Sequence, residues 1–262
     1  MLTKRLIACF DIIKGRVTKA VQFKDNIDVA SADELAELMY EAQIDELIFY
    51  DITASAEKRR IDIEAVRKTA RRVFIPFTVG GGIKDLEDMY QALKAGAEKI
   101  SVDSMAVRNP GIISEGAKSF GSQCIVLSTQ AKRTGNTPSS WEVFIDGARL
   151  ATGMDTIEWI RRGQELGAGE ICINSIDCDG TMAGYDLELM KLAEKAVSVP
   201  LIASGGAGKP EHLKDLFTDT QTQGAIISSM LYSPRAERNY SVRELKDYLI
   251  QNKINIRPAQ DH

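Results

Sequence analysis

The chain has 262 residues, of which 44% are hydrophobic and 27% are charged, and these fractions are ordinary for a globular protein. A formal net charge of −4 without a basic run argues against a nucleic-acid-binding protein, and no apolar run is long enough to span a bilayer. With only two histidines and no CxxC cysteine pair, the sequence indicates neither a metal nor an organic cofactor.

The first strand-like run, residues 6–11, is apolar without polar alternation and ends on Asp11. Such a run is typical of a strand that is buried on both faces in a parallel sheet. It begins so close to Met1 that no signal peptide fits before it. We therefore expect a cytoplasmic protein whose four cysteines are reduced.

Seven similar runs follow, and segments of helix length separate them. Ser31 and Glu34, for example, form a predicted capping box that opens a helix through about Ala42. Because eight strand–helix units are the count of a (β/α)8 TIM barrel, we predict this α/β fold. The predicted strands are residues 6–11, 45–51, 74–80, 99–103, 123–129, 169–175, 199–204 and 224–228.

The two halves of the chain resemble each other. Gly81 and Gly82 follow the third predicted strand, as Gly205 and Gly206 follow the seventh. An internal period of half the chain indicates a duplicated half-barrel, and neither half alone would close its sheet. We therefore predict one domain, residues 1–262, built from half-barrels of about 1–122 and 123–262.

Asp11 lies where the first predicted strand ends. A carboxylate at such a place is often only a turn or loop cap. In a parallel α/β fold, however, the carboxyl ends of all strands share one face, and the chemistry collects there. We therefore expect Asp11 to belong to a ring of functional residues at the barrel mouth.

Glycine pairs and serines form a repeated pattern after strands of both halves. Glycines let the backbone approach a ligand closely, and serines such as Ser104, Ser228 and Ser229 add hydroxyl donors. The glycines alone could serve tight turns, but the pattern occurs twice, half a barrel apart. Two phosphate sites across one mouth would suit an elongated substrate that is phosphorylated at both ends.

Segments along nearly the whole chain resemble the cyclase subunit of imidazole glycerol phosphate synthase. The resemblance runs from residue 1 to about 257, and segments that carry it are Phe10-Asp11, Phe49-Tyr-Asp-Ile-Thr-Ala-Ser55, Thr78-Val-Gly-Gly-Gly-Ile83, Asp179-Gly-Thr181 and Ala203-Ser-Gly-Gly-Ala-Gly208. It implies a lyase and cyclase of histidine biosynthesis that takes ammonia from a partner glutaminase. The implied substrate is phosphoribulosyl-formimino aminoimidazole carboxamide ribotide, and the products are imidazole glycerol phosphate and aminoimidazole carboxamide ribotide.

The resemblance also implies roles for individual residues. Asp11 corresponds to one of two acid–base aspartates, and Lys19, in the loop after the first strand, to a mobile lysine that helps close the site. A solvated loop lysine is the alternative for Lys19. One phosphate site is implied at Gly81, Gly82, Asp103 and Ser104, and the other at Asp179, Gly180, Gly205, Gly206, Ser228 and Ser229.

A second group of charged residues lies at the opposite, amino-terminal ends of the strands. Its members, Arg5, Glu46, Lys99 and Glu170, match the charged gate through which ammonia enters the barrel in the family, with Glu98 nearby on the implied docking face. Taken without the resemblance, such a ring of salt bridges could be purely structural. With it, we expect a glutaminase to dock at this face.

The chain departs from the family pattern at two positions. Gln130 replaces the second acid–base aspartate at the end of strand five, and an amide cannot exchange a proton near neutral pH. Asp103 replaces an asparagine beside a phosphate, where a carboxylate repels the ligand unless it is protonated, turned away or paired with a cation such as Lys19. We therefore expect the usual reaction to be impaired unless another group supplies the acid.

Three hypotheses fit this combination. The chain is an ordinary cyclase subunit with its second acid elsewhere, or it is a paralogue that uses the same ammonia on another substrate, such as a nucleotide-linked sugar. The third possibility is a catalytically weak subunit that docks and activates a glutaminase. Neighbouring genes separate the first two, and the third predicts glutaminase stimulation without a cyclised product.

Overall fold

Eight parallel strands pair in one closed ring in the computed structural model. The structure describes residues 3–21, 24–54, 57, 59–233, 236 and 238–260, and it describes no side chain of residues 19–27. The pairing of β7 with β10 closes the ring, so the fold is the predicted (β/α)8 TIM barrel. The barrel strands are β1 (Arg5–Ile13), β4 (Glu46–Asp51), β5 (Phe77–Gly80), β6 (Lys99–Val102), β7 (Ile125–Arg133), β10 (Glu170–Ser175), β11 (Leu201–Ser204) and β12 (Gly224–Ile226).

All eight predicted strands are confirmed, with shifted ends. β5 begins at Phe77 rather than at Phe74, because Pro76 has no N–H to donate to a strand ladder. The carbonyl of Pro76 still accepts a hydrogen bond from Leu47 of β4, so the chain joins the sheet at this point. β7 extends beyond its predicted end to Arg133.

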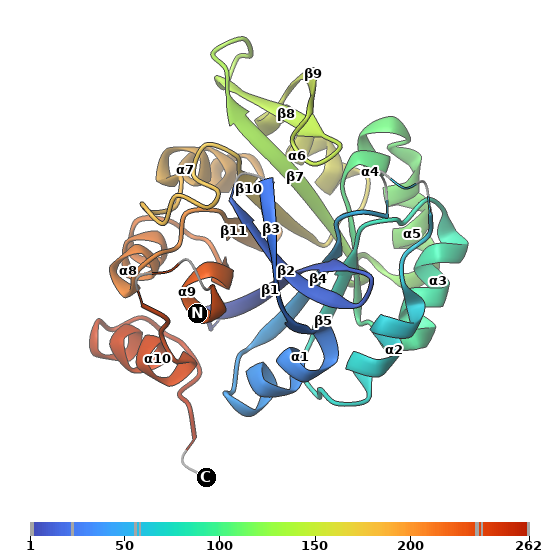
Figure 1. Ribbon diagram of the computed structural model, residues 1–262. Coiled ribbons are helices and arrows are strands. Elements are labelled where there is room, and N and C mark those ends of the chain that lie inside the picture. Colours follow the sequence, from blue (N-terminus) through green and yellow to red (C-terminus); the bar gives the residue numbers. More distant parts are fainter. Residues whose placement is uncertain are drawn as a thin grey trace.

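Helices surround the barrel as an outer layer (Figure 1). The predicted capping box at Ser31 is wrong, since the helix starts there without a side-chain cap bond, whereas Ser241 and Glu244 form such a box before the last helix. The helices are α1 (Ala32–Glu41), α2 (Ile63–Ala70), α3 (Leu86–Ala95), α4 (Ser104–Arg108), α5 (Gly111–Phe120), α6 (Thr156–Glu165), α7 (Leu187–Ala196), α8 (Pro210–Asp219), α9 (Ser228–Tyr232) and α10 (Val242–Gln251), with a 3-10 turn at Ser122–Cys124.

Two antiparallel hairpins extend the barrel at the carboxyl ends of β1 and β7. β2 (Arg16–Val21) and β3 (Lys24–Ser31) continue from β1, and β8 (Trp141–Ile145) and β9 (Leu150–Asp155) continue from β7. The second hairpin projects from the barrel (Figure 1). Each hairpin follows the first strand of one predicted half, which supports the proposal of a half-barrel repeat within one domain.

The side chains of the barrel strands alternate between two apolar regions. The larger region lies between the sheet and the helices and includes Leu6, Ala8 and Phe10. The smaller one, inside the barrel, includes Ile7 and Cys9. This two-residue period is the normal alternation of a strand, and it decides which side chains reach the interior.

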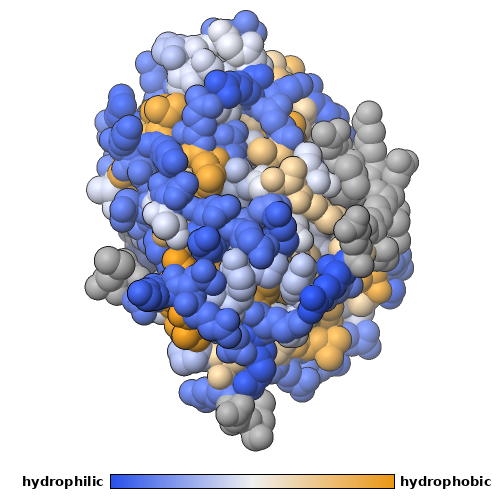
Figure 2. Space-filling model, turned by 90° about the vertical axis from the view of Figure 1, so that its left-hand side faces the viewer, coloured by the Kyte–Doolittle hydropathy of each residue, from blue (hydrophilic) through white to orange (hydrophobic). Residues whose placement is uncertain are grey.

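The outer surface is mainly hydrophilic on the side that carries α7, α8 and α10, where hydrophobic residues form small separate groups (Figure 2). Exposed polar residues on the outer faces of helices are expected, because the apolar stripe of each helix is buried against the sheet. Within the described part of the chain, no helix is both long and apolar enough to cross a membrane.

Candidate active site

The two-residue period of the strands brings polar residues to the inner face of the barrel mouth. On β1, Asp11 follows Ile7 and Cys9, which both lie in the interior cluster. Gln130 occupies the inner face of β7, and its register partner on β10 is Asn174. Asp103 follows directly after β6. The mouth thus contains the predicted acid Asp11 and both positions at which the sequence departs from the family pattern.

Asp103 and Gln130 are in direct contact. The Gln130 Nε2 atom donates a hydrogen bond to Oδ2 of Asp103 over 2.7 Å. Both residues are half-buried, and the Gln130 Oε1 atom is buried without a hydrogen-bond partner among the described residues. Burial raises the pKa of Asp103 to about 7, although the hydrogen bond from Gln130 acts in the opposite direction.

Lys19 lies in β2 and not in a loop as predicted, because the chain after β1 folds back as a hairpin. Its neighbour Thr18 is the register partner of Asp11, and the Thr18 hydroxyl donates to the Asp11 carbonyl over 3.3 Å. The Lys19 side chain lies outside the described part of the structure. The hairpin nonetheless brings its backbone next to the strand that carries Asp11.

Gly81 and Gly205 occupy equivalent tight turns after β5 and β11. Their φ angles are +84° and +90°, in the left-handed region that favours glycine. A Cβ atom at Gly81 would lie 2.3 Å from the Asp51 carbonyl oxygen, and one at Gly205 would lie 2.8 Å from the Ser175 carbonyl oxygen. The turn geometry alone therefore explains why both residues are glycine. Binding of a phosphate at either turn is a proposal.

The other predicted phosphate residues lie in neighbouring loops and helix starts. Ser104 begins α4 and accepts a hydrogen bond from the Asp146 N–H over 3.0 Å. Ser228 begins α9 and donates to the Cys9 carbonyl over 2.9 Å. The Ser104 hydroxyl therefore holds the turn at Asp146, and the Ser228 hydroxyl fastens the start of α9 to β1. Gly82 and Gly206 directly follow the two tight turns, Asp179 and Gly180 lie in the loop after β10, and Ser229 is the second residue of α9.

The predicted gate residues form a closed network at the amino-terminal end of the strands. The Arg5 guanidinium lies 2.6 Å from the Glu46 carboxylate and also pairs with Glu170. The Lys99 ammonium lies 2.9 Å from Glu46 and 2.8 Å from Glu170. We call Arg5, Glu46, Lys99 and Glu170 the charged ring. Glu98 precedes Lys99, and its side chain is exposed rather than part of this ring.

Burial and ion pairing act in opposite directions on the pKa values of Lys99 and Glu170 in the charged ring. Burial alone would lower the pKa of Lys99, but the nearby carboxylates outweigh this effect and raise it. For Glu170, burial alone would raise the pKa, but the two cations beside it lower it. Each of the four side chains contacts two of opposite charge, so the charges of the ring compensate one another.

Polar side chains connect the charged ring with the mouth, and sequence reasoning missed them. On β6, Ser101 lies between Lys99 and Asp103 at the same two-residue period. The Tyr50 hydroxyl lies 3.4 Å from the Ser101 hydroxyl and 3.4 Å from the Ser128 hydroxyl. We call Tyr50, Ser101 and Ser128 the polar strip. The two-residue period of a strand, applied to Lys99, would have identified Ser101 from the sequence.

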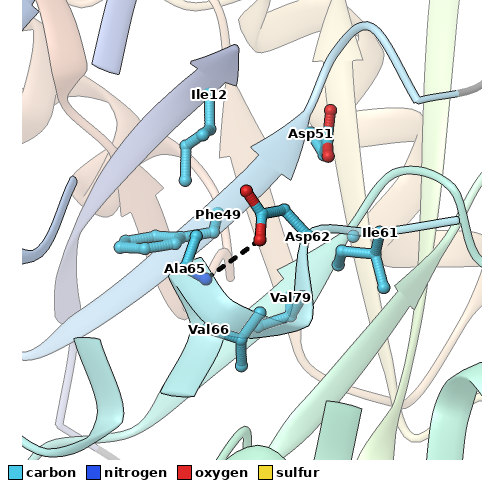
Figure 3. Close-up of a pocket in the computed structure, with 9 residues that line it drawn as sticks. Ile12, Phe49, Asp51, Ile61, Asp62, Ala65, Val66 and Val79 are labelled. Carbon is cyan, nitrogen blue, oxygen red and sulfur yellow. Dashed lines mark hydrogen bonds between the residues drawn. The ribbon is translucent and has the colours of Figure 1, made fainter. Parts of the chain in front are cut away.

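A small pocket lies outside the barrel, between α2 and the strands β1, β4 and β5 (Figure 3). Its lining is mostly apolar and includes Ile12, Phe49 and Val79. The Asp62 carboxylate in it accepts a hydrogen bond from the Ala65 N–H over 3.1 Å, which caps α2. The lining contains none of the predicted site residues, so this pocket is a packing gap and the active-site candidate is the mouth.

Comparisons with known proteins give one consistent result. The family model described as "Histidine biosynthesis protein" matches residues 5–237. A protein of Desulfosudis oleivorans, named imidazole glycerol phosphate synthase subunit HisF, is 50% identical over 98% of this chain and 99% of its own length. Proteins of the same name from Desulfatibacillum aliphaticivorans and Prochlorococcus marinus are 48% and 45% identical, over 98% and 99% of this chain and 98% and 100% of their own lengths.

Proposed function

The chain belongs to the histidine biosynthesis protein family, and we propose how its barrel performs the lyase and cyclase reaction of imidazole glycerol phosphate synthase. It is a cyclase subunit of that enzyme and acts in histidine biosynthesis. The observation that carries this function is the similarity over almost the whole chain, which includes both ends of the barrel strands. The roles of single residues that follow are our proposal.

The substrate in this proposal is phosphoribulosyl-formimino aminoimidazole carboxamide ribotide, which has a phosphate at each end. The equivalent turns at Gly81 and Gly205 stand after β5 and β11, on different sides of the mouth, and would each hold one phosphate through backbone N–H groups. Gly82, Ser104, Asp179, Gly180, Gly206, Ser228 and Ser229 complete the two sites. The reacting centre of the substrate then lies between them, over Asp11.

Asp11 acts as an acid–base group on the reacting atoms, and Lys19 helps to close the site over the bound substrate. Gln130 occupies the position of the second acid–base group, where its amide binds and does not transfer protons. Asp103, which the resemblance places beside a phosphate, accepts a hydrogen bond from Gln130. The two acid–base functions of the reaction thus depend on Asp11, Gln130 and Asp103 at the mouth.

Ammonia enters at the opposite end of the barrel. A glutaminase partner docks at the amino-terminal face of the strands, around Glu98, and delivers ammonia to the charged ring. The polar strip supports this route, because its hydroxyls offer hydrogen bonds to ammonia between the ring and the mouth. The complex works in the cytoplasm in this proposal, as histidine biosynthesis requires no export.

Steady-state kinetics test the proposal. We expect the unaltered chain to convert the ribulosyl substrate when ammonium salt is supplied at alkaline pH, and to use glutamine only when a glutaminase is added. Asp11→Asn should lower kcat by about 10²–10⁴ with little change in KM. Binding of the substrate without any turnover would refute the cyclase reaction, and failure to bind would favour another substrate.

A further inference from the structure

We infer that Asp103 supplies the second acid–base function of this barrel and that Gln130 positions its carboxyl group. The inference rests on the proposed function, because it concerns the same reaction at the same mouth. In the sequence alone, the two unusual residues are separate departures, one the loss of an acid and the other a disturbance of a phosphate site. Their direct contact makes them parts of one arrangement.

The geometry brings the carboxyl group to the place where the acid is needed. β6 and β7 are neighbours in the barrel, so a side chain at the end of one reaches the end of the other. In the family pattern an amide follows β6 and a carboxylate ends β7, whereas here Asp103 follows β6 and Gln130 ends β7. A carboxyl–amide pair is thus kept with its members exchanged, and glutamine is one methylene longer than the aspartate it replaces.

The hydrogen bond engages one oxygen of the carboxyl group. Gln130 Nε2 donates to Oδ2 of Asp103 over 2.7 Å, so Oδ1 lies outside this bond. A side chain held at one oxygen is oriented, and an oriented acid is what proton transfer requires. Gln130 is therefore a positioning residue, and Asp103 is the group that would contact the reacting atoms.

The surroundings of Asp103 suit an acid that works near neutral pH. Burial raises its pKa to about 7, and the negative charge of Asp146 acts in the same direction. Arg108 lowers it, but this guanidinium is paired with Asp146 over 2.6 Å. The thiol of Cys172, on β10, stays neutral because burial raises its own pKa to about 12.

The amide of Gln130 can serve both protonation states of the carboxyl group. Its Nε2 donates to the ionised form, and its Oε1 accepts from the protonated form once the amide turns over. Oε1 is buried without a partner among the described residues, so it is an unused acceptor at this place. The pair therefore persists while the proton moves.

The proton balance assigns one step to each carboxyl group. Ammonia adds to the ketone carbon of the ribulosyl group, one of its protons moves to the former ketone oxygen, and the resulting hydroxyl leaves as water when it receives a second proton from Asp103. The C–O bond breaks with its electron pair on the departing water, and the nitrogen forms the C=N bond and loses one proton to Asp11. Proton exchange with solvent restores both groups, and no oxidant or reductant is needed.

The test compares kcat and its pH dependence in single variants, each supplied with ammonium salt. Asp103→Asn should lower kcat by about 10²–10⁴, leave KM nearly unchanged and remove the limb of the kcat profile near pH 7. Asp219→Asn, an exposed carboxylate on α8, is the matched control and should change neither. Thermal unfolding of each variant confirms that it folds.

Gln130→Met provides a second measurement that leaves the carboxyl group in place. Because the amide lowers the pKa of Asp103, its loss should move the same limb to higher pH. A limb that is unchanged in Gln130→Met, or an Asp103→Asn variant with kcat within about threefold of the unaltered chain, would overturn the inference alone. Turnover that is absent even in the unaltered chain would overturn the proposed function and the inference with it.

Discussion

The ammonium nitrogen of Lys99 lies 2.9 Å from Oε1 of Glu46, a side chain that is entirely buried at the amino-terminal end of the barrel strands. Glu46 also pairs with Arg5 and accepts a hydrogen bond from Thr78 over 3.2 Å. Burying a carboxylate is unfavourable unless it is paired and hydrogen-bonded, and here both conditions are met. Removal of one cation therefore leaves a buried negative charge that is only partly compensated.

Lys99→Ala should lower the free energy of unfolding by about 3–5 kcal/mol, the usual effect of removing one partner of a buried pair. Urea denaturation at pH 7.5 measures it. Lys191→Ala is the matched control, because Lys191 pairs with Asp219 over 3.7 Å at an exposed site and should contribute less than about 1 kcal/mol. Equal losses in the free energy of unfolding would show that the buried pairs of Lys99 stabilise the fold no more than an exposed pair does.

Most of the fold could be predicted from the sequence, because the buried strands are short apolar runs with little alternation. Both hairpins were missed for the opposite reason. The segment that forms β2 and β3 contains charged residues such as Lys24 and Asp28, and it lies outside the eight-stranded ring, so it lacks the apolar signal. Residues 132–140, which lead into β8 and β9, are rich in turn residues, a composition typical of a loop rather than of a hairpin.

The site was only partly predictable for a different reason. Strand alternation indicates that Asp103 and Gln130 face the same interior, but the sequence does not show how far each side chain reaches. Their hydrogen bond depends on rotamers and on the register between β6 and β7. Ser31 illustrates the same limit, because a capping sequence is present and the cap bond is not.

The stability of the chain should depend on pH through Asp103. Its pKa is raised from 3.8 to about 7, so the folded state binds more protons than the unfolded state between these values. The free energy of unfolding contributed by this group therefore falls as the pH rises from about 4 to about 7. Asp103→Asn removes this titration.

We expect Asp103→Asn to be more stable than the unaltered chain by roughly 1–3 kcal/mol at pH 8, and by almost nothing at pH 4. Partial exposure of Asp103 keeps the effect below the full value for the shift. Urea denaturation at several pH values measures the difference. A gain that does not vary with pH would contradict a raised pKa in the folded state.

Exchange of the two groups should rescue the reaction. The double variant Asp103→Asn and Gln130→Asp restores the carboxyl group on β7 and the amide after β6, so its kcat should exceed that of Asp103→Asn by at least about tenfold. Gln130→Asp alone creates two adjacent carboxyl groups that repel each other and share one proton. A double variant no faster than Asp103→Asn would show that the two positions are not interchangeable.

Crowding around Gly81 predicts a large effect of one methyl group. Gly81 and Gly135 both have positive φ angles, +84° and +73°, so alanine is strained at either position. They differ in space, because a Cβ at Gly81 would meet the Asp51 carbonyl oxygen at 2.3 Å, whereas among the described residues, its two chain neighbours aside, none has an atom within 4 Å of a Cβ at Gly135. Gly81→Ala thus combines backbone strain with a steric clash, while Gly135→Ala has the strain alone.

Gly135→Ala should lower the free energy of unfolding by about 1 kcal/mol, and Gly81→Ala by about 3 kcal/mol or more. Thermal and urea denaturation of both variants measure the difference. The turn after β5 should also shift in Gly81→Ala and weaken binding of the phosphorylated substrate, which calorimetry detects. If the two turns after β5 and β11 hold the phosphates, Gly135→Ala leaves the binding of this substrate unchanged. Equal stability losses would mean that the backbone at Gly81 relaxes freely, which the close packing against β4 opposes.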